Sequence, residues 1–128
     1  MKLLLDTHLV LWAAGTPKRL SPVVRKLLEA PENELLVSAV SFWEIVIRQA
    51  LNRDDFKVDP RRLRRGLRDN GWTELPMTTD HALAVDRLPA LHRDPFDRML
   101  VAQAQVEGVV LLTTDALVAQ YPGSIRQV

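Results

Sequence analysis

Short apolar runs alternate with segments of helical periodicity along this chain. The run KLLL at residues 2–5 is typical of a buried strand, and residues 39–52 place apolar side chains at the i, i+3, i+4 spacing of a helix. The pattern predicts strands at 2–5, 34–38, 73–75, 109–112 and 125–128, and helices at 7–14, 21–30, 39–52, 60–69, 80–87, 95–107 and 115–120. This alternation predicts an α/β fold with a mainly parallel sheet covered by helices on both faces.

Four acidic residues stand out against this pattern because each lies where an element meets a turn, or inside an apolar helix. They are Asp6, Glu44, Asp97 and Asp115. In parallel sheets, ligands bind beyond the carboxyl ends of the strands, which is where Asp6 and Asp115 fall. Glu44 and Asp97 lie early enough in their helices to point the same way. Together the four carboxylates predict a site for a hard divalent cation such as Mg²⁺, suited to phosphodiester chemistry.

Helix capping is the alternative interpretation for three of these acids. Asp6 and Asp115 suit N-cap positions, and Asp97 suits the first turn of a helix that Asp94 caps. Capping does not explain Glu44, which lies inside AVSFWEIVI among apolar neighbours, where an unpaired carboxylate would be costly. A shared metal site accounts for all four, since crowded carboxylates repel one another and a divalent cation relieves that repulsion.

Composition narrows the classes of protein that fit. The 128 residues are consistent with one domain spanning 1–128, and the net charge of +1 argues against a strongly basic nucleic-acid binder. The chain has no Cys, and its three His residues match no zinc-ligand spacing. We expect His8 and His92 to be structural or peripheral, with a phosphate contact as the alternative for His92. The sequence lacks a signal peptide and a membrane-spanning run, so we expect a cytoplasmic protein with no membrane association.

The chain resembles PIN-domain ribonucleases of the VapC type, the toxins of type II toxin–antitoxin pairs. The matching strings are LLLDTHLVLW, SAVSFWEI, HRDPFDRMLVAQA and LLTTD, in that order. The resemblance implies a PIN-like three-layer α/β/α fold with about five strands. It also implies a toxin whose catalytic acids are Asp6, Glu44, Asp97 and Asp115, with Asp94 as the second choice for the third acid.

The same resemblance sets our expectations for mechanism and partners. Metal-assisted hydrolysis of RNA would use Mg²⁺, or Mn²⁺, held by Asp6, Asp97 and Asp115, while Glu44 would act as a ligand or a base. The number of ions stays open. We expect supporting contacts from Thr7, Ser41, Thr113, Asp94 and Arg98. The implied partners are an RNA substrate, a cognate antitoxin protein and a second copy of the chain in a homodimer. The apolar residues Phe42 to Ile47, together with Trp12, are candidates for a groove that receives a partner helix.

One basic cluster is a candidate RNA-binding rim, with a solvated helix face as the alternative. It comprises Arg61, Arg62, Arg64, Arg65 and Arg68. Other functions also remain open. A non-catalytic PIN-like module could hold RNA or an antitoxin without cutting. A receiver-like signalling domain would need a Lys at a late strand end, which is missing here, and a structure-specific DNA nuclease would need more chain.

Overall fold

The computed structural model describes residues 1–52 and 54–128, apart from the side chain of residue 55. The strands are β1 (Lys2–Leu5), β2 (Glu34–Ser38), β3 (Thr73–Leu75), β4 (Val110–Thr113) and β5 (Ile125–Gln127). The α-helices are α1 (Thr7–Gly15), α2 (Pro22–Glu29), α3 (Ala39–Ala50), α4 (Pro60–Asp69), α5 (Thr79–Ala84) and α6 (Pro95–Glu107). No helix among the described residues is long and apolar enough to cross a membrane.

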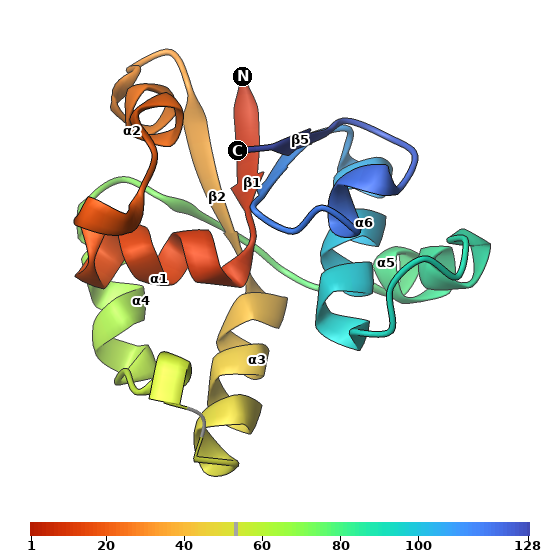
Figure 1. Ribbon diagram of the computed structural model, residues 1–128, viewed down its shortest axis with the longest axis horizontal. Helices are drawn as coiled ribbons and strands as arrows, with labels where there is room; N and C mark the ends of the chain where they lie inside the picture. The colour runs from red at the N-terminus through yellow and green to blue at the C-terminus, as the bar shows by residue number, and fades with distance from the viewer. Residues whose placement is uncertain (53) are drawn as a thin grey trace.

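The five strands form one parallel sheet in the order β3-β2-β1-β4-β5. The most apolar strand, β1, is central, with Leu4 opposite Leu36 of β2 and Leu111 of β4. Figure 1 shows α1, α2 and α4 on one side of the sheet and α5 and α6 on the other. This is the predicted three-layer α/β/α arrangement.

Side-chain alternation along the strands builds a separate core on each face of the sheet. Leu3 and Leu5 of β1 belong to a buried cluster that includes Leu9 of α1 and Leu63 of α4. Leu4, between them, belongs to a second cluster that includes residues 100–102 of α6. Every residue of β1 except Lys2 is fully buried. The centre of the sheet is therefore a well-packed support for the side chains at its carboxyl edge.

The carboxyl ends of β1, β2 and β4 meet at one edge of the sheet. β1 passes directly into α1 through Asp6, whose backbone N–H donates to the carbonyl of Leu112 at 3.0 Å. β2 passes directly into α3 through Ser38, which caps that helix. β4 ends at Thr113, which is fully buried. Polar side chains therefore gather where the apolar strands end.

Most predicted elements agree with the structure to within one or two residues, and two short ones differ. The predicted helix at 115–120 is reduced to the 3₁₀ turn Val118–Gln120. The predicted helix at 80–87 ends at Ala84 and continues as the 3₁₀ turn Val85–Arg87. Segments this short gain too few i→i−4 hydrogen bonds to offset helix nucleation, so the tighter turn is favoured. At the other extreme, α6 ends as predicted at Gly108, whose φ of +65° suits a residue without a Cβ.

Candidate functional site

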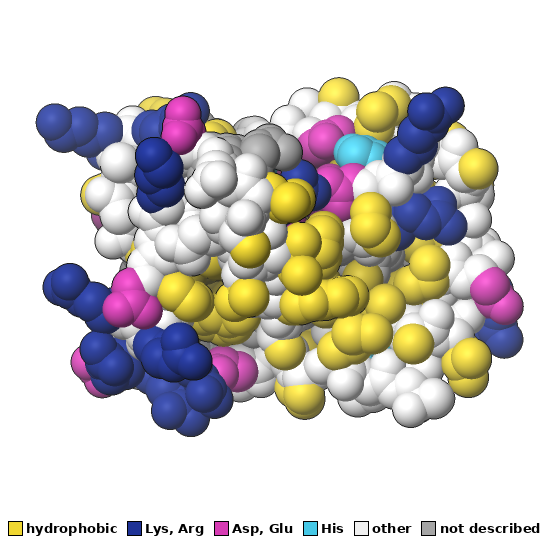
Figure 2. All heavy atoms as spheres, turned by 90° about the horizontal axis from the view of Figure 1, so that it is seen from below, with side chains coloured by type: hydrophobic (Ala, Val, Ile, Leu, Met, Phe, Trp, Pro, Cys, Tyr) yellow, Lys and Arg dark blue, Asp and Glu magenta, His cyan; other side chains and the backbone are white. Residues whose placement is uncertain are grey.

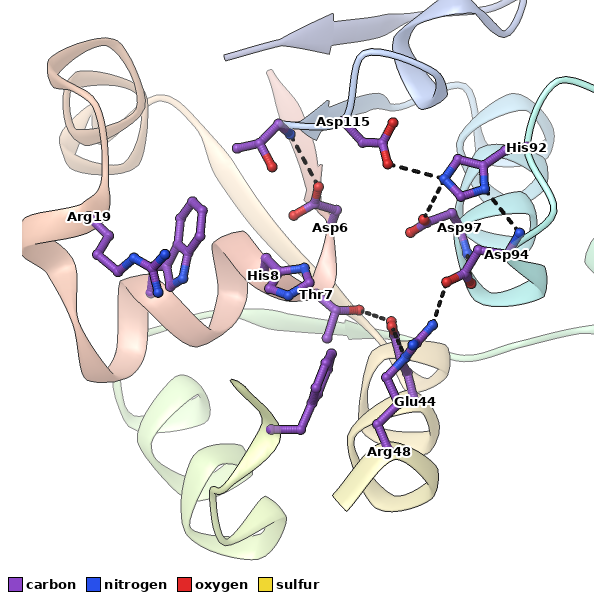
Figure 3. A pocket seen from close by; sticks show the side chains of 13 residues that line it. Asp6, Thr7, His8, Arg19, Glu44, Arg48, His92, Asp94, Asp97 and Asp115 are labelled. Carbon is purple, nitrogen blue, oxygen red and sulfur yellow. Dashed lines mark hydrogen bonds and ion pairs between the residues drawn. The ribbon is translucent and has the colours of Figure 1, made fainter. Parts of the chain in front are cut away.

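The four predicted acids converge on one cleft of about 500 Å³ at the carboxyl edge of the sheet. Figure 3 shows Asp6, Glu44, Asp97 and Asp115 together with Asp94 around this cleft. They come from the β1–α1 junction, α3, the start of α6 and the end of β4. Asp6 is 7% exposed and Glu44 is 4% exposed, so these two carboxylates are almost out of contact with solvent.

Accepting from backbone N–H groups does not prevent these acids from clustering. In each of three acids, one carboxylate oxygen accepts from backbone N–H groups and the other is directed to another side chain. In Asp6, Oδ1 accepts from the N–H of Leu9 to cap α1, while Oδ2 accepts from Thr113 Oγ1 at 2.8 Å and from the N–H of Thr114 at 3.3 Å. Asp94 caps α6 through Oδ1 and directs Oδ2 to Arg48.

Asp115 divides its oxygens in the same way. Its Oδ1 accepts from the N–H groups of Leu117 and Val118, at 2.8 and 3.3 Å, while Oδ2 faces His92. The capping interpretation is therefore correct for Asp6 and Asp94, whereas Asp115 accepts from a turn and does not cap a helix. Asp6 and Asp115 each direct the second oxygen towards the cleft, and the second oxygen of Asp94 pairs with Arg48.

Glu44 is held from two sides. Thr7 Oγ1 donates to its Oε1 at 2.6 Å and lies 2.9 Å from Ser41 Oγ, so both predicted hydroxyl residues support it. On the other side, Nε of Arg48, one turn later in α3, lies 2.7 Å from Oε2 of Glu44. Burial raises the pKa of Glu44, against the hydrogen bond from Thr7 and the charge of Arg48, which lower it.

Asp97 lies in a strongly unfavourable environment for a carboxylate. Its pKa is raised from 3.8 to about 7, first because it is buried and then because Asp94, Glu44 and Asp6 add negative charge nearby. Burial also raises the pKa of Asp6, although hydrogen bonds from Leu9, Thr113 and Thr114 lower it. The anionic forms of these acids are therefore destabilised, and a cation bound beside them would stabilise them.

The sequence suggested a peripheral position for His92, but in the structure this residue lies between two of the acids. Its Nε2 is 3.1 Å from Oδ2 of Asp115 and 3.4 Å from Oδ2 of Asp97. Its Nδ1 accepts from the backbone N–H of Asp94 at 3.0 Å, so in the neutral ring the proton is on Nε2. Burial raises the pKa of Asp115, but hydrogen bonds from His92, Val118 and Leu117 outweigh burial and lower it overall.

The donor set fits a hard divalent cation. His92, Asp97 and Asp115 place ligand atoms within 4.8 Å of one another. In this ring position, however, the proton on Nε2 makes His92 a hydrogen-bond donor and not a ligand. The oxygens of Asp97 and Asp115 remain, Asp6 lines the same cleft, and carboxylate oxygens are the ligands that Mg²⁺ and Mn²⁺ prefer. A cation there would also offset the charge that raises the pKa of Asp97.

Arg98, expected near the acids, points away from them. Its guanidinium donates to the carbonyls of Pro89 and Val85 and to the hydroxyl of Tyr121. That hydroxyl in turn accepts from the backbone N–H of His92 at 2.9 Å. Arg98 thus supports the loop that carries His92 and does not contact the acids directly.

The basic cluster on α4 does not face one common surface. Arg64 donates from Nε to both carboxylate oxygens of Glu74, and Nε of Arg68 lies 3.5 Å from the same group. Arg61 lines a groove with Arg64 and Glu74. Only Arg62, among the cluster residues described, lines a second groove of about 560 Å³ that shares Trp12 and Arg19 with the acid cleft.

Sequence reasoning missed one residue at the centre of the site and misplaced another feature. Arg48 stands four positions after Glu44, a spacing that puts both side chains on one helix face, so the signal was present. The prediction that Trp12 and residues 42–47 form one groove is wrong. Trp12 lines the acid cleft, whereas Phe42 and Val46 line the separate groove beside α4.

The fold and the cleft together define a parallel α/β domain with a carboxylate cluster at the carboxyl edge of its sheet. The sequence profile of the PIN domain matches residues 3–123, so the chain belongs to the PIN domain family. This confirms the family to which the four sequence strings pointed. Among curated protein sequences, none matches the chain significantly.

Solved structures agree with this fold over nearly the whole chain. VapBC2 from Rickettsia felis, bound to a DNA fragment from its promoter, has a TM-score of 0.71 at 14% identity, covering 99% of this chain and 98% of that one. DNA-bound VapBC from Salmonella typhimurium has a TM-score of 0.68 at 18% identity with the same coverage. FitAcB from Neisseria gonorrhoeae has a TM-score of 0.55 at 19% identity, covering 91% of this chain and 89% of that one.

Proposed function

We propose that this chain is a metal-dependent endoribonuclease that hydrolyses RNA phosphodiester bonds and acts as the toxin of a toxin–antitoxin pair. The observation that carries the proposal is the position of Asp97. It lies among Asp6, Glu44, Asp94 and Asp115 with a pKa of about 7, in a cleft open to a polymer. The PIN family membership and the similarity to VapBC structures support the proposal.

Each cleft residue would have a defined task in the reaction. Bound Mg²⁺ or Mn²⁺ would activate water and neutralise the scissile phosphate. Asp6, Asp97 and Asp115 would hold the cation, with Thr113 fixing the second oxygen of Asp6. Thr7 would hold Glu44 in place. The Nε2–H of His92 would orient Asp115.

Cleavage of total cellular RNA by the purified, antitoxin-free protein tests the proposal. The reaction would be run with Mg²⁺, with Mn²⁺ and with EDTA, beside the Asp97→Asn protein. We expect fragments with either metal and none with EDTA or with the variant. If a folded, metal-binding protein leaves every RNA intact, the nuclease assignment fails and a non-catalytic module that holds RNA or an antitoxin replaces it.

The groove between α1 and α4 is the best-supported path for RNA away from the acids. Arg19 lies with its guanidinium 4.6 Å from the ring centroid of Trp12, and both residues border the cleft and the groove. Arg62 lines the groove farther along. Arginine and a partly exposed aromatic ring suit phosphates and bases of a single strand.

Replacing Arg19 and Arg62 together by Ala should weaken RNA binding and flatten its salt dependence by about 0.7 per lost phosphate contact. The binding of a labelled oligoribonucleotide to the Asp97→Asn protein, measured over a salt series, avoids cleavage. The matched control replaces Arg64 and Arg68, which are already paired with Glu74, and should change little. If both double variants lost the same RNA affinity, the basic residues would contribute only through general electrostatic attraction and not through specific contacts in the groove.

An exposed apolar surface supports the proposal of protein partners. Trp43, Val46 and Ile47 of α3 are 54%, 51% and 40% exposed, and Figure 2 shows apolar side chains gathered in the middle of the face that carries this helix. Apolar patches of this kind commonly mark protein interfaces. We propose that the chain forms a homodimer and binds an antitoxin.

Sedimentation velocity of the isolated chain should show a dimer at micromolar concentration. A monomer at every concentration measured would contradict the proposed homodimer.

A further inference from the structure

Arg48 occupies one half of the acid cluster as a fixed cation. Its Nε lies 2.7 Å from Oε2 of Glu44, and its Nη2 pairs with Oδ2 of Asp94, which bridges α3 to the start of α6. The guanidinium also lies 5.5 Å from the ring centroids of Phe56 and Phe96. Its side chain is only 19% exposed. Figure 3 shows Arg48 entering the cleft below the acids.

This pairing leaves Glu44 and Asp94 with both oxygens engaged. Glu44 gives Oε1 to Thr7 and Oε2 to Arg48. Asp94 gives Oδ1 to the first N–H groups of α6 and Oδ2 to Arg48. A divalent ion in this half of the cleft would have to compete with a guanidinium for the same oxygens.

The other half of the cleft has no comparable fixed cation among the described residues. Asp97 and Asp115 face the Nε2–H of His92, at 3.4 and 3.1 Å. The cleft-facing oxygen of Asp6 accepts only from the neutral groups of Thr113 and Thr114 among its hydrogen bonds in the described chain. His8 also lies near Asp6, so each of these three acids has an imidazole nearby, but none of them is paired with a guanidinium among the described residues.

We propose that Arg48 limits the cleft to a single divalent ion, held at Asp6, Asp97 and Asp115. Two-metal nuclease sites place their ions about 4 Å apart and need carboxylates on both sides. Here the second side is taken by an arginine whose removal from its partners would leave a half-buried charge unpaired, which is strongly unfavourable. Arg48 is thus a positioning residue, and the inference rests on the metal chemistry proposed above.

The test is to count bound Mn²⁺ on metal-free protein by electron paramagnetic resonance of the free ion. The wild-type chain should bind one Mn²⁺. The Arg48→Gln protein should bind a second, at least ~10-fold tighter than any second ion on the wild type. The Arg48→Lys protein, which keeps the charge, should return to one. Arg65→Gln makes the same change in net charge on the exposed face of α4 and should also bind one.

Two Mn²⁺ ions on the wild-type chain would overturn the inference, whether or not the Arg48→Gln protein folds. An Arg48→Gln protein that is folded by circular dichroism and still binds a single ion would overturn it as well. Failure of the proposed function gives a different result, because a wild-type chain that binds one ion and cuts no RNA would contradict the nuclease and leave the role of Arg48 standing.

Discussion

The Asp97→Asn protein should be more stable than the wild type when no metal is bound. At pH 8 the wild-type chain must keep the Asp97 carboxylate ionised beside Asp94, Glu44 and Asp6, although its pKa in the folded state is about 7. The amide removes that buried charge. We expect the free energy of unfolding to rise by on the order of 2 kcal/mol, which is a Tm increase of several degrees for a domain of this size.

The stability difference should depend on pH in a defined direction. Between about pH 4 and pH 7 the folded wild type keeps a proton on Asp97 that the unfolded chain, with a pKa near 3.8, has released. The unfolded state therefore binds fewer protons, so the contribution of Asp97 to stability falls as pH rises through this window. The two proteins should be most alike below about pH 4 and differ most near pH 8.

Thermal unfolding in EDTA from about pH 4 to about pH 8 would measure this difference, because this range spans the unfolded and folded pKa values of Asp97. The matched control is Asp80→Asn, which removes an exposed acid from the first turn of α5 and should bring no stabilisation. Added Mg²⁺ should reverse the order, because ligand binding stabilises the wild type preferentially. A variant less stable than the wild type at pH 8 would mean that Asp97 is not under electrostatic stress.

The sequence was sufficient to find the acids because each is out of place locally. Glu44 interrupts an apolar helix face, and Asp6 and Asp115 end apolar strands, so a local pattern marks all three. Parallel strands with helices on both faces then imply that these positions share one edge, as the structure shows. The sequence did not show that the two oxygens of one carboxylate can have different partners. Capping and cation binding therefore looked like competing explanations for the same residue.

Other features depend on contacts between distant segments. Arg48 pairs with Asp94, 46 residues later, and His92 with Asp115, 23 residues later. His92 lies in an irregular segment before α6, where no periodicity shows which way a side chain points. The role of Arg98 depends on Tyr121, which only the tertiary fold brings beside it. Strand order was equally out of reach, since alternation predicts parallel pairing but does not say which strands are neighbours.

The Asp6→Asn protein should lose RNA cleavage by at least ~100-fold while keeping its fold. Asparagine is as good an N-cap as aspartate, so α1 should still begin at Thr7. The amide cannot supply both the anionic charge and two accepting oxygens, so the cleft loses a metal-holding group. Cleavage of a defined RNA in Mg²⁺, beside circular dichroism, measures the two effects separately.

Asp59→Asn is the matched control, because Asp59 caps α4 in the same way but lies outside the acid cleft. If capping were the whole role of Asp6, both variants would cut RNA at the wild-type rate. If Asp6 also holds the cation, as its second oxygen suggests, only the Asp6 variant should fail, and its affinity for Mn²⁺ should fall with it. An Asp6→Asn protein that cleaves normally would remove the carboxylate cluster as the reacting centre, and with it the reason for proposing a nuclease.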